Sequence, residues 1–113
     1  MNNKTSSVFL HLAEAPWTAA GAGIQRQVMG YDPTVMLVKV KFEKGAVSDK
    51  HAHPHSQTTC VVSGSFILDV DGEQQVLSAG DGFYIPPGAL HGVSCLEAGV
   101  LLDAFSPYRE DFL

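Results

Sequence analysis

Residues 51–57 read HAHPHSQ, in which three histidines alternate and a glutamine follows. Successive side chains of a strand point to opposite faces, so His51 and His53 can project together from one strand. Neutral imidazoles bind zinc, iron, nickel, copper or manganese-like ions, and two of them do not choose among these metals. A further histidine is needed from elsewhere in the chain. His91 is the obvious candidate, because it follows a PPG turn at residues 86–88 that would reverse the chain onto a facing strand.

Strand patterns dominate the chain from its middle onward. Residues 38–43 alternate apolar and charged side chains, which is the period of a half-buried strand. Residues 66–70 do much the same and end in Asp71-Gly72, a hairpin signal, before the return run at residues 74–77. Further strands are predicted at residues 25–29, 58–63, 82–85, 92–96 and 100–105. Many short strands separated by glycine and proline turns predict an all-β sandwich or barrel.

The composition narrows the classes of function. A chain of 113 residues, 45% hydrophobic and 17% charged, predicts one folded domain. The net charge of −5 and the lack of a basic stripe argue against nucleic acid as a partner. No apolar run approaches the roughly 18 residues that span a bilayer, so no membrane partner is expected. The apolar stretch near the N-terminus is too short, and too interrupted by His11 and Glu14, for a signal peptide, so a cytoplasmic location is expected by default.

The two cysteines carry no chemistry in this interpretation. Cys60 and Cys95 form no CxxC pair and belong to no dense cysteine pattern. Both are expected to be buried thiols that behave as small hydrophobic side chains.

Two motifs, in order and at the right spacing, resemble those of the cupin superfamily. Residues 45–64 contain His51-x-His53 and Gln57 between two glycines, with Gln in place of the usual Glu. Residues 80–91 (GDGFYIPPGALH) look like the second motif. Cys95 stands where that motif often has Asn, at a position that is not usually a ligand.

The cupin resemblance implies a fold and a metal site. The fold is a single-domain double-stranded β-helix, the cupin jelly-roll barrel, at residues 34–105, with residues 1–20 as an N-terminal arm or dimer-contact segment. The cofactor is a divalent transition metal (Zn, Ni, Fe or Mn). The ligands implied by the two motifs are His51, His53, Gln57 and His91.

A closer resemblance lies at the C-terminal end. LLDAFSPYREDFL at residues 101–113, PTVMLVKVKFEKGAV at residues 33–47 and the Gln-bearing first motif are similar to the pectin-degradation cupins. That family converts 4,5-unsaturated monouronates, left after lyases have cut pectin or alginate, to linear 5-keto-4-deoxyuronate. The similarity runs from about residue 21 to residue 113. It implies a ring-opening enzyme of hydrolase or isomerase type, with catalytic residues beside the metal at Asp103, Phe105 and Arg109.

The residue types agree with these roles. Asp103 and Phe105 lie two apart on one expected strand, so they share a face, and a charge inside an apolar run needs a reason. Asp103 is therefore assigned as general acid/base, and Phe105 is expected to pack on the sugar. Arg109 offers a bidentate fork suited to a substrate carboxylate. The alternatives are an edge-strand aspartate, a core or rim phenylalanine, and a surface arginine paired with Glu110 or Asp111.

The neutral Gln57 has an electrostatic consequence. A divalent ion on a set of three histidines and one glutamine keeps its full positive charge, which favours an anionic substrate and strengthens the ion as a Lewis acid. His55 is separated from the strand by Pro54 and is expected to lie at the rim or in solvent, not to be a ligand.

Two other functions stay open. One is a metal-dependent cupin dioxygenase or isomerase that acts on another small anion. The other is a cupin that binds a sugar acid without turnover. Cupins of this kind are commonly homodimers, so a second copy of the chain is the expected protein partner by analogy of fold.

Overall fold

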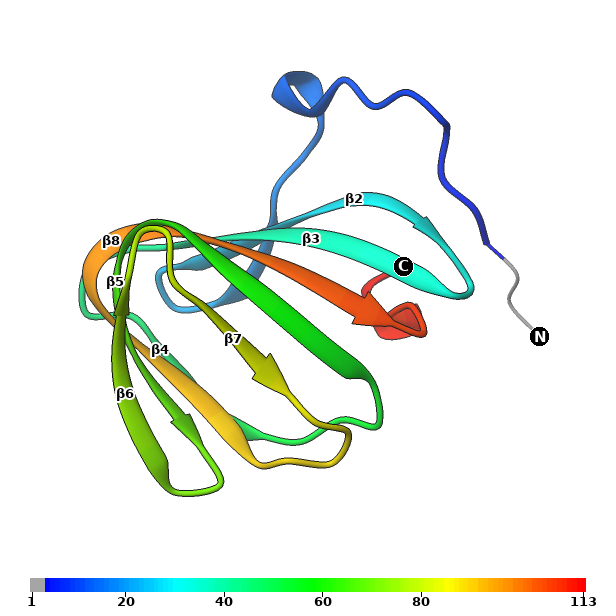
Figure 1. The fold of residues 1–113 in the computed structure, drawn as a ribbon. Coiled ribbons are helices and arrows are strands. Elements are labelled where there is room, and N and C mark those ends of the chain that lie inside the picture. Colours follow the sequence, from blue (N-terminus) through cyan, green and yellow to red (C-terminus); the bar gives the residue numbers. More distant parts are fainter. Residues whose placement is uncertain (1–3) are drawn as a thin grey trace.

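Eight antiparallel β-strands form a jelly-roll barrel in the computed structural model, which describes residues 4–113 (Figure 1). The strands are β1 (Thr18–Gly21), β2 (Ile24–Asp32), β3 (Val35–Phe42), β4 (Val47–His51), β5 (Ser56–Val70), β6 (Glu73–Ser78), β7 (Gly82–Ile85) and β8 (His91–Ser106). Two 3₁₀ turns flank them, η1 (Leu12–Glu14) and η2 (Glu110–Phe112). None of the helices at residues 4–113 has the length and apolarity needed to cross a membrane. The prediction of an all-β cupin barrel is confirmed.

The central strands β5 and β8 are long and bend together. β8 pairs with β3, β4 and β5, and β5 also pairs with β6 and β7. The sequence predicted two shorter strands in place of each, broken at Gly64 and Gly99, and that prediction is wrong. The glycines allow a close crossing: a Cβ on Gly64 would lie 2.5 Å from the carbonyl oxygen of Glu97, and one on Gly99 would overlap the carbonyl of Ser63.

The predicted hairpin is confirmed. β5 and β6 pair in the register Val70↔Glu73, and the turn residues Asp71 and Gly72 have φ values of 50° and 88°. Positive φ at both central residues matches the twist of a two-residue hairpin. The short strand β1 was not predicted, and of β4 only the strand position of His51 was, because neither segment shows the apolar alternation that marks a half-buried strand.

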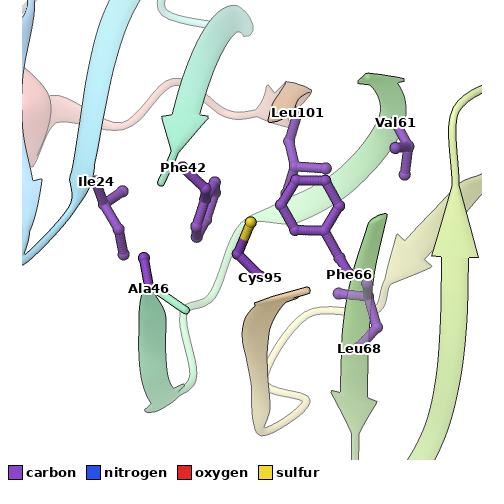
Figure 2. Packing of buried hydrophobic residues seen from close by; sticks show 8 residues of the cluster. All are labelled: Ile24, Phe42, Ala46, Val61, Phe66, Leu68, Cys95 and Leu101. Carbon is purple, nitrogen blue, oxygen red and sulfur yellow. The ribbon is translucent and has the colours of Figure 1, made fainter. Parts of the chain in front are cut away.

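One apolar cluster fills part of the barrel interior (Figure 2). Its buried members are Ile24, Phe42, Ala46, Val61, Phe66, Leu68, Cys95 and Leu101. The rings of Phe42 and Phe66 meet edge to face with centroids 5.3 Å apart. Cys95 is buried as predicted, but Cys60 is exposed, because it alternates along β5 with the inward-facing Thr59 and Val61.

The chain before β1 crosses the outer face of β2. The side-chain amide of Gln27 donates to the carbonyl oxygens of Leu12 at 2.7 Å and Ala15 at 3.2 Å. Gln27 is only 2% exposed, although it points away from the barrel interior. This segment therefore covers an outer face of the sheet, whereas its use as a dimer contact stays a prediction.

Candidate functional site

Three of the five histidines meet at one end of the barrel. His51 ends β4 and His91 begins β8, and the two are paired across those strands. His53 follows the end of β4, so it does not share a strand with His51 as the alternation predicted. The three side chains still converge, with candidate ligand nitrogens that all lie within 4.8 Å of one another. The sequence prediction that His91 would join the first two is confirmed as a matter of position.

Backbone carbonyls hold the three imidazoles in place. Each Nδ1 lies within hydrogen-bond distance of a carbonyl oxygen two residues away: His51 to Asp49 at 2.9 Å, His53 to His55 at 3.2 Å, and His91 to Ala89 at 2.9 Å. Such bonds place the proton on Nδ1 and leave Nε2 as the free lone pair. Burial lowers the pKa of His53 and of His91, so both rings favour the neutral state that binds a metal.

Gln57 is oriented by a buried polar network. The hydroxyl of Thr59 donates to Asp103 Oδ1 at 2.7 Å, so the Thr59 oxygen is free to accept. Gln57 Nε2 donates to Thr59 Oγ1 at 3.1 Å and to Asp103 Oδ1 at 3.4 Å. With the amide nitrogen on that side, Gln57 Oε1 faces His53 Nε2 at 2.9 Å.

This arrangement leaves His53 one proton short. The neutral ring lies between two acceptors, the carbonyl oxygen of His55 and Gln57 Oε1, and it carries only one N–H. A cation bound by His53 Nε2 and Gln57 Oε1 satisfies both lone pairs at once. Nitrogen and amide-oxygen donors suit several divalent transition metals. The donor set therefore fits a metal ion held by His51, His53 and His91 with Gln57 beside them, and it does not select one metal.

Asp103 lies inside the sheet, not at an edge. β8 places it between Val38 of β3 and Thr59 of β5, so the alternative of an edge-strand aspartate does not describe it. Its side chain is buried among the groups around Gln57. Burial raises the pKa of Asp103 to about 6, against the opposing hydrogen bond from Thr59. A carboxyl group that titrates near neutral pH can both give and take a proton.

The raised pKa of Asp103 predicts a pH-dependent stability in metal-free protein. The folded chain holds this proton more tightly than the unfolded chain, so the stabilising contribution is complete below the ordinary pKa of 3.8 and is lost as the pH rises through about 6. We expect wild type to lose about 2 kcal/mol of unfolding free energy relative to Asp103→Asn between pH 4 and pH 7.5. Urea unfolding of both proteins with a chelator present measures the difference. Parallel pH profiles would contradict the assignment.

Arg109 lies beside the pocket but is already paired. Its Nε donates to Asp111 Oδ1 at 3.0 Å, and a terminal nitrogen donates to Oδ2 at 2.8 Å. The alternative of a surface arginine paired with Glu110 or Asp111 names the right partner, Asp111, but the Arg109 side chain is only 12% exposed. Its Cζ lies 5.0 Å from the ring centroid of Phe105. The hydrogen bonds from Arg109 lower the pKa of Asp111.

A cavity of about 280 Å³ opens among these groups. Six of the seven predicted site residues line it: His51, Gln57, His91, Asp103, Phe105 and Arg109. The seventh, His53, does not line the cavity but contacts Gln57, with its Nε2 2.9 Å from Gln57 Oε1. Ten other residues line the cavity and were not predicted as site residues, Arg26 and Phe112 among them. A charged residue in a strand or an aromatic residue in a tail carries no spacing signal that would assign it to the cavity.

His55 lies outside the histidine group. Its ring contacts those of His53 and Phe105, with centroids 5.5 Å and 6.3 Å away. Its Nδ1 is buried and has no hydrogen-bond partner within residues 4–113. Its place outside the group agrees with the expectation that His55 is not a ligand, whereas its buried Nδ1 does not fit a histidine in solvent.

Comparisons with known proteins match the fold and most of the chain. The cupin domain family model (Cupin_2) matches residues 38–105. The pectin degradation protein KdgF of Dickeya dadantii is 42% identical over 88% of this chain and 93% of its own. The structure of an RmlC-like cupin from Shewanella frigidimarina superposes with a TM-score of 0.93 at 44% identity, covering 96% of this chain and 98% of the other. The structure of KdgF from a Halomonas species superposes with a TM-score of 0.88 at 40% identity, covering 96% and 100%.

Proposed function

The chain belongs to the cupin domain family, and we propose that it is a metal-dependent enzyme of pectin or alginate breakdown. Its reaction would convert 4,5-unsaturated monouronates to linear 5-keto-4-deoxyuronate by ring opening and tautomerisation. The observation that carries the proposal is that a buried acid, Asp103, joins Gln57 in the same cavity as the histidine group. The names of two relatives, both KdgF proteins and one a pectin degradation protein, support the substrate class.

The size and charge of the cavity suit a single sugar acid. A volume of about 280 Å³ is at the lower end for small-molecule sites, which favours one sugar ring over a longer chain. Two guanidinium groups, those of Arg26 and Arg109, line the cavity. Among residues 4–113, Arg109 forms an ion pair with Asp111, and Arg26 forms none. The donor set itself is neutral, so a bound divalent ion adds positive charge that is not cancelled locally.

The residues of the chain divide the work of the reaction. A bound metal would supply Lewis-acid polarisation of the uronate oxygens. Asp103 accepts its hydrogen bonds at Oδ1, and its Oδ2 makes none within residues 4–113, so Oδ2 is the atom that can hold or move a proton. Asp103 takes the proton whose loss opens the hemiacetal, or delivers one to C4 as the enol becomes a ketone. Phe105 packs on the sugar ring, and its position in the cavity wall supports this role.

The test of this function is direct. We expect the metal-loaded protein to remove the absorbance of an unsaturated monouronate faster than its spontaneous rate. The rate should be the same with and without oxygen, because the ring opening consumes none. A reaction that stops under anaerobic conditions would favour the dioxygenase alternative instead. Saturable binding of the sugar acid with no turnover would favour the non-catalytic alternative.

Loss of the Asp103 carboxylate should slow the reaction with little effect on the fold. We expect Asp103→Asn to lower kcat by about 10²–10⁴-fold, the range for loss of a general acid or base. Asp69→Asn is the matched control, because Asp69 is also buried but lies outside the cavity, next to Lys50. Initial rates at saturating substrate, with metal content checked, measure the effect. Full turnover by Asp103→Asn would remove this residue from the mechanism.

A homodimer and a cytoplasmic location remain predictions. The metal could be Zn, Ni, Fe or Mn, and metal analysis of purified protein would identify it.

A further inference from the structure

Arg26 projects into the cavity from β2. It pairs with Val40 of β3, which in turn pairs with Leu101 of β8, and all three line the cavity. Its Cζ lies 3.8 Å from the ring centroid of Phe112, and the Cζ of Arg109 lies 4.2 Å from the same centroid. Contact with an aromatic face holds a guanidinium in place without using its N–H groups.

The two arginines of the cavity differ in what already binds them. Two nitrogens of Arg109 donate to the carboxylate of Asp111, which balances its charge. The guanidinium of Arg26 makes no hydrogen bond or ion pair in the part of the chain that the structure describes. It is half-buried, and burial, followed by the positive charge of Arg109, lowers the pKa of Arg26. The charge of Asp111 opposes this shift, but the Asp111 carboxylate is bonded to Arg109. The guanidinium of Arg26 therefore has no bonded anion, and it can bind the carboxylate of a ligand that enters the cavity.

We propose that Arg26 is the specificity-determining residue that binds the carboxylate of the sugar acid. The proposal rests on the proposed function for the identity of the substrate. This role was predicted for Arg109, but two nitrogens of Arg109 are bonded to Asp111. The five N–H groups of Arg26 make no hydrogen bond among residues 4–113. Phe112 then positions Arg26, because its ring contacts the guanidinium groups of both Arg26 and Arg109.

The consequence is a preference for an acid over the corresponding neutral sugar. Galacturonate and galactose differ in having a carboxylate or a hydroxymethyl group at the same carbon. With Arg26 present, the zinc-loaded protein should bind galacturonate more tightly than galactose. Without it, much of that preference should disappear, while contacts to the sugar hydroxyls are unchanged.

The experiment compares three variants by calorimetric titration with both sugars after zinc loading. We expect Arg26→Gln to weaken galacturonate binding by about 10-fold to 100-fold, the effect of losing a charge-assisted bidentate contact, and to leave galactose binding unchanged. Arg26→Lys should fall between, because lysine keeps the charge and loses the fork. Lys41→Gln is the matched control: it removes one positive charge from the exposed, opposite face of the neighbouring strand, and it should match wild type. Zinc content and the unfolding midpoint confirm that each variant is intact.

Turnover of the unsaturated monouronate gives an independent readout. Arg26→Gln should raise KM more than it lowers kcat, because the contact is made to a group that does not react. Wild-type galacturonate affinity in Arg26→Gln would overturn the proposal, and so would a wild-type protein that does not distinguish the two sugars. If wild type binds galacturonate through Arg26 yet turns over no unsaturated monouronate, the proposed reaction fails and the inference on Arg26 holds.

Discussion

Replacement of His91 by alanine is expected to abolish stoichiometric metal binding. His91 is buried, and it joins His51 and His53 from a distant part of the chain, with ring centroids 4.4 Å and 4.8 Å away. Loss of a residue that only orients a ligand lowers metal affinity by roughly 10-fold to 100-fold, and we expect loss of an actual ligand to exceed about 100-fold. Elemental analysis of protein dialysed against trace metal measures the occupancy. Turnover should fall to the spontaneous rate.

Two other histidines provide controls for this result. His11 is exposed and lies outside the histidine group, so His11→Ala should keep full metal occupancy. His55→Ala should also keep it, and that variant tests whether the rim histidine is a ligand. A second readout is the metal-induced rise of the unfolding midpoint, which should vanish only in His91→Ala, because binding to the folded state alone stabilises it. An unchanged metal stoichiometry in His91→Ala would refute the proposed ligand set.

Replacement of Gly99 by alanine is expected to prevent the barrel from closing. A Cβ at this position would overlap the carbonyl oxygen of Ser63 on β5, and it would also press on the backbone of Gly64. Both obstacles are backbone atoms of a paired strand, which cannot move without breaking the ladder. We expect the free energy of unfolding to fall by more than about 4 kcal/mol. Losses of this size are rare for single substitutions and occur where a substitution disrupts the packed backbone or core.

Gly45→Ala is the matched control for Gly99→Ala. Gly45 has a φ of 83° and nothing within 4 Å of its ideal Cβ, so alanine there meets only left-handed backbone strain of about 1–2 kcal/mol. Urea unfolding of both variants, or the yield of folded protein where Gly99→Ala does not accumulate, measures the contrast. A Gly99→Ala protein as stable as Gly45→Ala would show that β5 and β8 can separate at this point.

The chemistry of the site was easier to predict than the strands that carry it. Motif spacing and the C-terminal similarity identified His51, His91 and Asp103, which line one cavity in the structure. A motif match identifies residues by their place in the sequence, so it does not depend on correct strand boundaries. Glycine misled the strand predictions: in most sequences it ends a strand, but Gly64 and Gly99 let two continuous strands cross closely. Whether a glycine ends a strand or permits a close crossing depends on the partner strand, so the sequence around Gly64 or Gly99 alone does not show it.

Other features follow from tertiary contacts that leave no local pattern. Gln25, Arg26 and Gln27 form a polar run that predicts little about which side faces inward. The structure turns Arg26 to the cavity and buries Gln27 on the outer face under residues 12–15. Polarity and alternation do not show which of Arg26 and Gln27 faces the cavity. The environment of each side chain is formed by a segment far away in the sequence.

The pairing of β8 has a consequence for the synthesis of the protein. β8 is the last strand of the barrel, yet it pairs with β3, β4 and β5, so a growing chain holds seven strands before the one that joins them is available. His91 begins that strand, and Asp103 and Phe105 lie near its end. Until β8 is available, β3 and β5 each lack one of their partners and β4 lacks its pairing with β8. Apolar surface that is exposed in this way makes incomplete chains prone to aggregation. Barrel closure and completion of the histidine group therefore both depend on the synthesis of β8.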